Sequence, residues 1–463
     1  MSRVITIMDK GRETAAGYRS SGISYQQLLD GDTRAIPPVL RLESPIEPGI
    51  TRVPAERYFS RASHDLEVEK IWKRVWQMAC REEDIPEVGD YQVYDVAHLS
   101  FLVVRQPDLS IKAFYNACLH RGRQLREWGG KRADEFRCPF HGWAWEVNGS
   151  LKDVTCAWDF PDVTPESHAL PEVKVGTWGG FVFINPDADS GSLEDFLGTL
   201  PDQFKRWDLS KRFKQAHVAK ILRCNWKVAQ EAFMEAYHVV VTHPQLLAAL
   251  GDSNSQYDVF GNYSRAITPN GTPSPHIKWQ PTQQQMIDAM FDLQYGEESA
   301  IPVPEGSSAR AVAASVSRMG MAPVLGEQMA DDYTDAEYND AFYYTLFPNL
   351  HPWGGFNRIT YRFRPYGDDP DQSIMECMFL APFPQDGPRP PSAPIHWLGA
   401  DDDWVEAPEL GMLARVFNQD TYNVPKVQIG LKAMKHPEVV FASYNETKVR
   451  HFHQLWDAWT AAE

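Results

Sequence analysis

Two mixed pairs of cysteine and histidine give the sequence its clearest chemical signal. Cys118 and His120 lie in the segment CLHRG, and Cys138 and His141 lie in the segment CPFHGW. A two-iron, two-sulfur cluster with two thiolates on one iron and two imidazoles on the other takes one ligand of each kind from each loop. A zinc site is the alternative, but zinc motifs usually pair like with like. The four residues therefore predict an iron–sulfur cluster that accepts electrons and passes them on.

A second group of metal-binding residue types surrounds His238 and His243. Residues 225–237 contain no glycine or proline, so we expect a helix in which Glu231, Glu235 and His238 share one face. A proline directly after His243 favours a bend that brings the second imidazole towards the first. Two histidines and one carboxylate form the ligand set of mononuclear iron(II) sites that activate oxygen. Taken alone, the pair is equally compatible with two ordinary histidines beside a core helix.

Together these motifs resemble those of the Rieske-type non-haem iron oxygenases, namely the alpha (catalytic) subunits of the aromatic-ring-hydroxylating oxygenases. The similarity rests on CLHRG with CPFHGW, on NWK at 225–227 and on the pattern E-x3-E-x2-H-x4-H, and it extends from about residue 52 to 450. The resemblance implies an α+β protein with an all-β Rieske domain, followed by a helix-grip (START-like) catalytic domain with an antiparallel sheet. It also implies two cofactors, a Rieske 2Fe-2S cluster and a mononuclear non-haem Fe(II).

The resemblance further implies a third iron ligand, a carboxylate far downstream of the two histidines. Asp420, in the segment FNQDTYN, is the residue that we expect to join them. Acidic residues between 401 and 409 compete, but they lie in a run interrupted by tryptophan and proline, which is typical of a solvated loop. Two later histidines, His451 and His453, are assigned to the surface or to helix packing and not to metal binding.

Glu235 is the position at which the sequence departs from the family pattern. An aspartate usually stands there, and the resemblance implies that it bonds the first iron histidine and a Rieske histidine of the neighbouring subunit. In this chain Glu235 would join His238 to His141 of the partner subunit, as part of the electron path. Some family members that oxidise quaternary ammonium compounds also carry glutamate at this position. Glu231, one turn earlier, is a candidate outer acceptor or a carboxylate stabilised by the helix dipole.

Two kinds of structure must hold these residues. Short β-type runs separated by Gly and Pro turns indicate a small all-β domain, and later strand and helix patterns indicate a sheet covered by a long helix with the pocket between them. We therefore expect an N-terminal arm at 1–51, a Rieske domain at 52–190 and a catalytic domain at 191–463. The segment 251–332, rich in Gly, Pro, Ser, Gln and Met, is expected to be a long irregular cover of a functional site.

Composition excludes several classes of function. The 463 residues carry a formal net charge of −17 without a basic block, which argues against binding to nucleic acid or to anionic membranes. The N-terminus lacks the apolar core of a signal peptide and no segment has the apolar length of a membrane span, so we expect a cytoplasmic location. Six scattered cysteines then favour metal ligation over disulfides. Because nicotinamide-binding and ferredoxin motifs are absent from the sequence, electrons must come from a separate NAD(P)H-dependent reductase, with or without a ferredoxin.

The function that we expect is the mono- or dihydroxylation of an aromatic or other bulky apolar substrate with O2, as in aromatic hydrocarbon catabolism. The resemblance also implies that the chain forms a homotrimer, with or without beta subunits. One alternative is a Rieske monooxygenase that cleaves or demethylates a quaternary ammonium compound. A Rieske electron-transfer or ligand-binding protein without oxygenase activity is an alternative from another class, and a zinc-stabilised scaffold is a further one. The aromatic residues that we expect around the pocket suit an arene or another bulky apolar molecule but could equally cage a trimethylammonium group: they are Phe342, Tyr343, Tyr344, Trp353 and Phe356.

Overall fold

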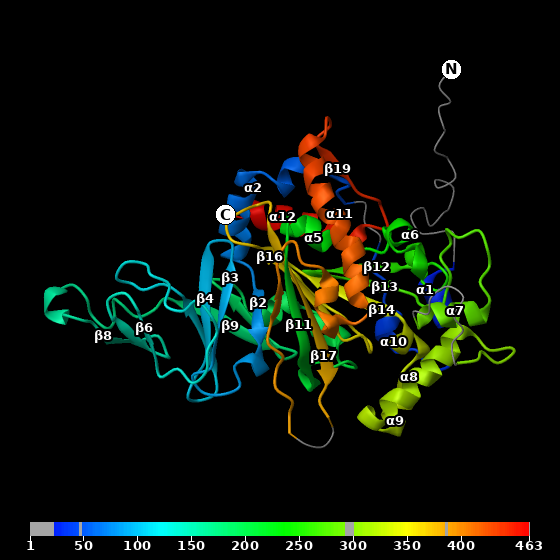
Figure 1. Ribbon diagram of the computed structural model, residues 1–463, viewed down its shortest axis with the longest axis horizontal. Coiled ribbons are helices and arrows are strands. Elements are labelled where there is room, and N and C mark those ends of the chain that lie inside the picture. The colour runs from blue at the N-terminus through cyan, green and yellow to red at the C-terminus, as the bar shows by residue number, and fades with distance from the viewer. Residues whose placement is uncertain (1–22, 46–48, 292–300, 385–387, 463) are drawn as a thin grey trace.

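Two large sheets lie beside each other along the long axis of the molecule (Figure 1). The computed structural model describes residues 23–45, 49–291, 301–384 and 388–462. The arrangement confirms the expected α+β fold, in which an all-β domain precedes a helix-grip domain with an antiparallel sheet. Within the described segments, none of the helices combines the length and the hydropathy that a bilayer span requires.

The first sheet carries the two Cys/His loops at one end of the molecule. Its six strands are antiparallel and run in the order β2-β10-β9-β5-β4-β3. A small sheet, β6-β7-β8, extends from it at the far end of Figure 1. Trp143 and Trp145 pack there in one buried cluster with Leu102 and Phe114 of the large sheet. The strand bounds are β2 Gln77–Arg81, β3 Tyr91–Val96, β4 Leu99–Arg105, β5 Ile111–Tyr115, β6 Glu135–Arg137, β7 Ala144–Glu146, β8 Leu151–Asp153, β9 Glu172–Trp178 and β10 Phe181–Asn185.

The second sheet forms the floor of the catalytic domain. Its eight strands run in the order β12-β13-β14-β15-β16-β17-β11-β18, and only the β11–β18 pair is parallel among the described strands. β11 and β17 form its longest ladder. The bounds are β11 Arg212–Leu222, β12 Gln256–Phe260, β13 Tyr263–Thr268, β14 Ala341–Leu346, β15 Leu350–Pro352, β16 Ile359–Pro365, β17 Ser373–Pro382 and β18 His396–Leu398.

Helices cover one face of this second sheet (Figure 1). α5 (Trp226–Glu231) packs on β16 and β17, and the long helix α11 (Leu413–Ala433) packs on α5. α12 (Thr447–Ala461) lies against β12 and β13. The remaining helices are α1 Tyr25–Leu29, α2 Arg61–Glu67, α3 Leu193–Leu197, α4 Leu200–Gln203, α6 Val239–Thr242, α7 Gln283–Met290, α8 Ala309–Leu325, α9 Glu327–Asp332 and α10 Asp335–Asn339.

The expectation of an irregular cover at 251–332 is wrong for most of the described part of that segment. It contains β12 and β13, which pair as a hairpin and extend the catalytic sheet, followed by α7 and α8. Gly261, with a φ of 49°, makes the turn of that hairpin. The Gly and Ser content that indicated irregular structure therefore marks turns between regular elements.

The N-terminal segments contact the catalytic domain closely. Tyr25 donates to Asp340 at 2.9 Å, and β1 (Arg52–Pro54) pairs with β19 (Glu438–Val440). Residues 1–22 and 46–48 of the expected arm lie outside the described residues. The division into an arm at 1–51, a Rieske domain at 52–190 and a catalytic domain at 191–463 stays a proposal.

Candidate metal centres

The two Cys/His loops share one backbone geometry. In each loop the cysteine N–H donates to the carbonyl five residues later, at 2.8 Å from Cys118 and 2.7 Å from Cys138. The glycine four residues after each cysteine donates to the cysteine carbonyl, at 2.8 Å from Gly122 and 3.0 Å from Gly142. Both glycines have a positive φ, 76° and 81°, which other residues rarely adopt. The related motifs therefore fold into matched tight turns that each present one thiol and one imidazole.

The four candidate cluster ligands converge between these turns. Cys118 and Cys138 are buried, and the rings of His120 and His141 lie 4.6 Å apart. Burial raises the pKa of the Cys118 thiol, and the neighbouring Cys138 thiol adds to the rise. His120 Nδ1 is buried without a hydrogen-bond partner, as expected of a ligand atom reserved for a metal. Trp143 stacks on the His120 ring at 5.1 Å and shields it from water.

The spacing of these four ligands argues against a single zinc ion. Four ligands of one tetrahedral zinc lie within roughly 4 Å of one another, given metal–ligand bonds of about 2.0 to 2.3 Å. The quartet contains no set of three donor atoms within 4.8 Å, whereas another group of described residues does. Ligands that are divided between two irons have this wider spacing. The donor set therefore fits a 2Fe-2S cluster and not a mononuclear site.

That other group is His238, His243 and Asp420. Among the described residues, it is the one set of three or more potential ligands whose donor atoms all lie within 4.8 Å of one another. Asp420 Oδ1 lies 2.8 Å from His243 Nε2 and 3.5 Å from His238 Nε2. The competing acidic residues are placed elsewhere, for example Asp401, which pairs with the exposed Arg223. Two imidazoles and one carboxylate fit the ligand set of a mononuclear iron(II) site.

The second nitrogen of each histidine is fixed by an acceptor. His238 Nδ1 lies 2.7 Å from Glu235 Oε1, and His243 Nδ1 lies 2.8 Å from Gln419 Oε1. Gln245 donates to the same Gln419 oxygen at 2.8 Å and holds the amide in place. Because the acceptors keep the proton on Nδ1, both Nε2 atoms are free to bind a metal. Sequence reasoning missed Gln419, whose one signal was its place beside the candidate carboxylate.

The backbone around Glu235 is not helical, so the helix predicted at 225–237 is wrong beyond Glu231. α5 ends at that residue, and α6 begins only after His238. In the intervening turn Glu235 Oε2 accepts the His238 N–H at 2.9 Å, while Oε1 binds the ring. One carboxylate thus orients both the backbone and the ring of His238. This double contact replaces the helical hydrogen bonds that the sequence favours.

The charges around His238 suit a bound cation. Burial lowers the pKa of His238, but the carboxylates of Glu235 and then Asp420 outweigh burial and bring the pKa to about 8. The site is therefore electronegative where the imidazole nitrogens converge.

Glu231 does not face these ligands, so the expectation that it shares a face with Glu235 is wrong. Its carboxylate accepts from the Tyr58 hydroxyl at 3.1 Å and lies 2.9 Å from His453 Nε2. Arg57 donates to His453 Nδ1 at 3.1 Å, so Nε2 carries the proton that His453 donates to Glu231. Burial raises the pKa of Glu231 to about 8. His453 is a fully buried packing residue, in agreement with its assignment from the sequence.

Aromatic rings line the sheet side of the candidate iron site. Phe233 lies 5.1 Å from Tyr361 and 5.9 Å from Phe417, and the last two rings are 5.8 Å apart. Phe417 precedes Asp420 on α11 by about one helical turn. This aromatic cluster therefore adjoins the carboxylate and excludes water from that side.

The five aromatic residues expected around the pocket are divided between two places. Phe342, Tyr344 and Phe356 belong to other aromatic clusters, away from α11. Tyr343 and Trp353 pack together at 5.4 Å, and Trp353 reaches the aromatic cluster. Successive side chains of β14 point to opposite faces of the sheet, which separates Tyr343 from its neighbours. The prediction that all five lie around the pocket is therefore wrong for Phe342, Tyr344 and Phe356.

Two family models match the chain. The model described as "Ring hydroxylating alpha subunit (catalytic domain)" matches residues 203–462, and the model described as "Rieske [2Fe-2S] domain" matches residues 75–164. The first match covers more than half of the chain and includes all three candidate iron ligands. The second includes the whole quartet.

Curated relatives are similar over part of their length. Biphenyl 2,3-dioxygenase subunit alpha of Rhodococcus jostii is 31% identical over 203 residues, which is 42% of this chain and 44% of the relative. Chloroplastic choline monooxygenase of Beta vulgaris is 30% identical over 216 residues, 45% and 48% of the two chains. The carnitine monooxygenase oxygenase subunit of Escherichia coli K12 is 27% identical over 219 residues, 46% and 57%. The matches thus span about half the length of these relatives.

Solved structures share the fold along nearly the whole chain. The quaternary ammonium Rieske monooxygenase CntA in complex with L-carnitine has a TM-score of 0.62 at 16% identity and covers 90% of this chain and 99% of its own. Naphthalene 1,2-dioxygenase with bound indole has a TM-score of 0.62 at 19% identity and covers 89% and 92%. At such identities the similarity establishes the fold alone.

Proposed function

Because the chain belongs to the family of ring-hydroxylating alpha subunits, we propose that it is the oxygenase component of an enzyme that uses O2 and externally supplied electrons to hydroxylate an organic substrate. The observation that carries the proposal is the convergence of His238, His243 and Asp420, with both histidine rings held by acceptors at Nδ1. An electron carrier with an inert large domain would not need that site.

The residues of the chain have distinct roles in this proposal. The quartet Cys118, His120, Cys138 and His141 would hold a 2Fe-2S cluster, and the three convergent ligands would hold iron(II). When bound, these groups supply electrons and a place where O2 is activated. Glu235 and Gln419 orient the imidazoles, and the aromatic cluster excludes water and packs against the apolar part of the substrate.

We propose that electrons pass between copies of the chain. In Figure 1 the small sheet lies at one end of the molecule, and the first large sheet stands between it and α11 and α6, so the two candidate centres of one chain lie apart. Glu235 is only 10% exposed, but its neighbours Tyr237 and Val241 are 49% and 81% exposed, as at an interface. A head-to-tail homotrimer, with or without beta subunits, would place His141 of the partner subunit beside Glu235.

Electrons would reach the cluster from a separate NAD(P)H-dependent reductase, with or without a ferredoxin. A cytoplasmic location is part of the same proposal.

For the substrate we propose an aromatic or other bulky apolar compound, which would pack on the aromatic cluster. A quaternary ammonium compound is the second candidate, because the same rings could bind its cationic head and because glutamate occupies position 235. The family includes enzymes of both kinds among the relatives above. Oxygen uptake with a surrogate reductase, screened over arenes and quaternary amines with identification of the products, separates the two.

Replacing His243 tests the proposal directly. We expect His243→Ala to abolish substrate-dependent O2 consumption, to lower the iron content from about three to about two per chain, and to leave the visible spectrum of the Rieske cluster unchanged. Gln245→Ala, which removes only an outer hydrogen bond, is the matched control and should retain the third iron. Full turnover in His243→Ala with the native reductant would refute the site assignment.

A further inference from the structure

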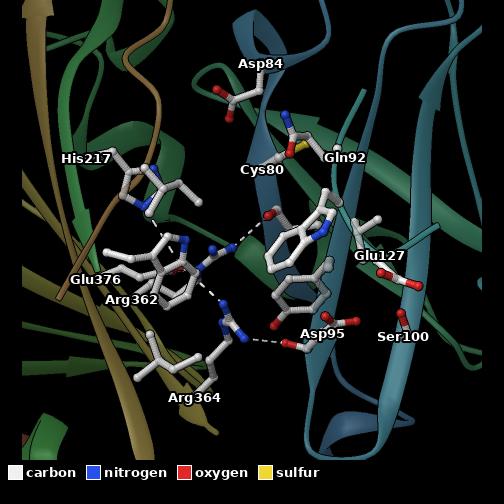
Figure 2. A pocket seen from close by; sticks show the side chains of 18 of the residues that line it. Cys80, Asp84, Gln92, Asp95, Ser100, Glu127, His217, Arg362, Arg364 and Glu376 are labelled. Atoms are coloured by element: carbon white, nitrogen blue, oxygen red, sulfur yellow. Dashed lines mark hydrogen bonds and ion pairs between the residues drawn. The ribbon is translucent and has the colours of Figure 1, made fainter. Parts of the chain in front are cut away.

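The two sheets border a cavity of about 1640 Å³, away from the candidate iron ligands (Figure 2). Its lining contains equal numbers of acidic and basic side chains. The buried ones pair with each other: Arg362 and Arg364 form ion pairs with Glu376, and Lys214 lies 2.8 Å from Asp84. These charges are satisfied within the protein and serve the contact between the sheets.

A different group of buried polar side chains lies beside the turn that carries Glu235. Tyr257 of β12 pairs with Ala266 of β13, and Ala266 pairs with Tyr343 of β14, so the three side chains share one face of the sheet. Because the alanine between them is small, the two tyrosines belong to one buried cluster. We call the hydroxyl groups of this face the hydroxyl row, which consists of Tyr257, Tyr343, Thr268 and Ser255.

Tyr257 binds the backbone of the turn between α5 and α6. Ala236 lies in this turn, and its N–H donates to the Tyr257 hydroxyl at 3.0 Å in a buried position. Burial raises the pKa of Tyr257 well above its ordinary value, and the neighbouring Tyr343 and Glu235 add to the rise, so the hydroxyl is neutral. The next residue before Ala236 is Glu235, whose carboxylate orients the His238 ring. Tyr257 therefore connects the sheet to the segment that orients a candidate iron ligand.

The proton positions along the hydroxyl row follow from its two ends. At the far end Ser255 donates to the Asp252 carbonyl at 2.6 Å, and a carbonyl can only accept. Ser255 therefore accepts from Thr268 at 2.7 Å, and Thr268 accepts from Tyr343 at 3.0 Å. At the near end the backbone N–H can only donate, so the Tyr257 proton is free to point to the Tyr343 hydroxyl, with which it interacts. All these hydrogen bonds point in one direction, in which each strengthens the next.

We propose that Tyr257 is a positioning residue of the candidate iron site, and that the hydroxyl row behind it holds it in place. Without this acceptor the buried N–H of the turn would lack a partner, and the turn would shift to find one. Such a shift would displace Glu235 and, with it, the His238 ring. The inference rests on the proposed function, since it assumes that His238 binds iron(II).

The affinity for iron(II) tests the proposal without substrate or reductase. The chain with its 2Fe-2S cluster, freed of the third iron, is dialysed anaerobically against iron(II), and the iron bound in excess of the cluster gives the dissociation constant. We expect Tyr257→Phe to weaken iron(II) binding about tenfold, the lower end of the effect of losing an outer contact of a metal site. Tyr263→Phe is the matched control, because it removes a buried tyrosine hydroxyl of the same hairpin that contacts Thr199 at 2.8 Å. It should bind iron(II) like the unmodified chain.

Variants of Thr268 distinguish the hydroxyl row from a single contact. Thr268→Val keeps the shape of the side chain and removes its hydroxyl, so the Tyr343 proton loses its acceptor and we expect iron(II) to bind about threefold more weakly. Thr268→Ser keeps the hydroxyl and should have the affinity of the unmodified chain. Equal affinities of the two variants would show that the row does not hold Tyr257 in place, and this part of the proposal would be wrong.

Melting temperatures and the variant His243→Ala separate the ways in which the inference could fail. Equal losses of affinity in Tyr257→Phe and Tyr263→Phe would show a general loosening of the hairpin and would overturn the positioning role. The same holds if Tyr257→Phe is folded and binds iron(II) like the unmodified chain, while His243→Ala does not bind it. If His243→Ala itself binds iron(II) like the unmodified chain, the proposed function is wrong, and the inference fails with it.

Discussion

At the scale of single residues, Glu235 has the most specific task, because its two oxygens hold the ring and the backbone of His238. We expect Glu235→Gln to keep the fold and the Rieske spectrum but to lower turnover about 10- to 100-fold, the usual effect of losing an outer carboxylate of a metal site. The turnover of Glu235→Asp should lie between that of Glu235→Gln and that of the unmodified chain. Reoxidation of the reduced cluster in a single turnover, followed by stopped-flow absorbance, measures the effect. An unchanged reoxidation rate in Glu235→Gln would remove Glu235 from the electron path.

Glu231 predicts a pH dependence of stability. Burial raises its pKa from 4.5 to about 8 in the folded chain, so the folded state binds the proton more tightly than the unfolded state does. Protonated Glu231 therefore contributes its full stabilisation of the fold below the pKa of the unfolded chain, and this contribution is lost as the pH rises through about 8. The contribution amounts to a few kcal/mol. Glu231→Gln should therefore raise the melting temperature at pH 9 relative to the unmodified chain and change it little at pH 5. If Glu231→Gln instead lowered the melting temperature more at pH 9 than at pH 5, this account would be contradicted.

The candidate metal ligands were predictable because metal chemistry dictates their types and their spacing. Cys118, His120, His238 and His243 stand in motifs that leave little freedom. Gln419 was not predictable, because a glutamine acceptor reaches its histidine only through tertiary structure and needs no fixed spacing. The same holds for Arg57, which sets the tautomer of His453 from the other end of the chain.

At the scale of elements, the histidine helix shows where local propensity fails. Residues 232–237 contain no helix breaker, yet the chain leaves the helix at Ala232, because the Glu235 carboxylate offers the His238 N–H a stronger acceptor than a helical carbonyl would. Strands of the catalytic sheet were easier to predict, since the strand patterns at 341–347, 359–366 and 374–383 in the sequence lie close to the bounds of β14, β16 and β17. The hairpin of β12 and β13 was not predicted, because its buried polar residues obscure the alternation of apolar and polar side chains that indicates a strand.

The contact between the two sheets depends on the strand β16. Arg362 donates to the carbonyls of Met78 and Ala79 in β2, at 2.9 and 2.7 Å, and Glu376 holds Arg362 in place. Removing Glu376 leaves buried cations without their partner, which typically costs about 3 to 5 kcal/mol. We expect Glu376→Gln to lower the melting temperature by several degrees, measured by scanning calorimetry.

The matched control for that variant is Glu409→Gln. Glu409 pairs with His396 in a partly exposed position, where an ion pair contributes at most about 1 kcal/mol. The two variants remove the same charge from the same chain. Equal melting temperatures would show that the buried ion pairs do not stabilise the contact between the sheets.

At the scale of the whole molecule, the sequence predicted the order of the two folds but not how they are joined. The Trp72 and Trp226 rings, 5.0 Å apart, and the pairing of β1 with β19 connect segments that no local pattern relates. These contacts hold the small sheet at one end of the molecule, with the first large sheet between it and α11 (Figure 1). This separation is the reason for our proposal that electrons pass between copies of the chain and not within one copy.

Complementation between two inactive variants tests that arrangement. Cys138→Ser removes the cluster, and His243→Ala removes the iron, so neither homo-oligomer should turn over. When the two are co-expressed in equal amounts and assemble at random in a head-to-tail ring, about a quarter of the interfaces pair an intact cluster with an intact iron site. We therefore expect about a quarter of the unmodified activity. Co-expression of His243→Ala with the double variant Cys138→Ser/His243→Ala is the control and should remain inactive. If mixed oligomers form, shown by differential affinity tags, and no activity returns, electrons do not cross between copies and the trimeric electron path must be abandoned.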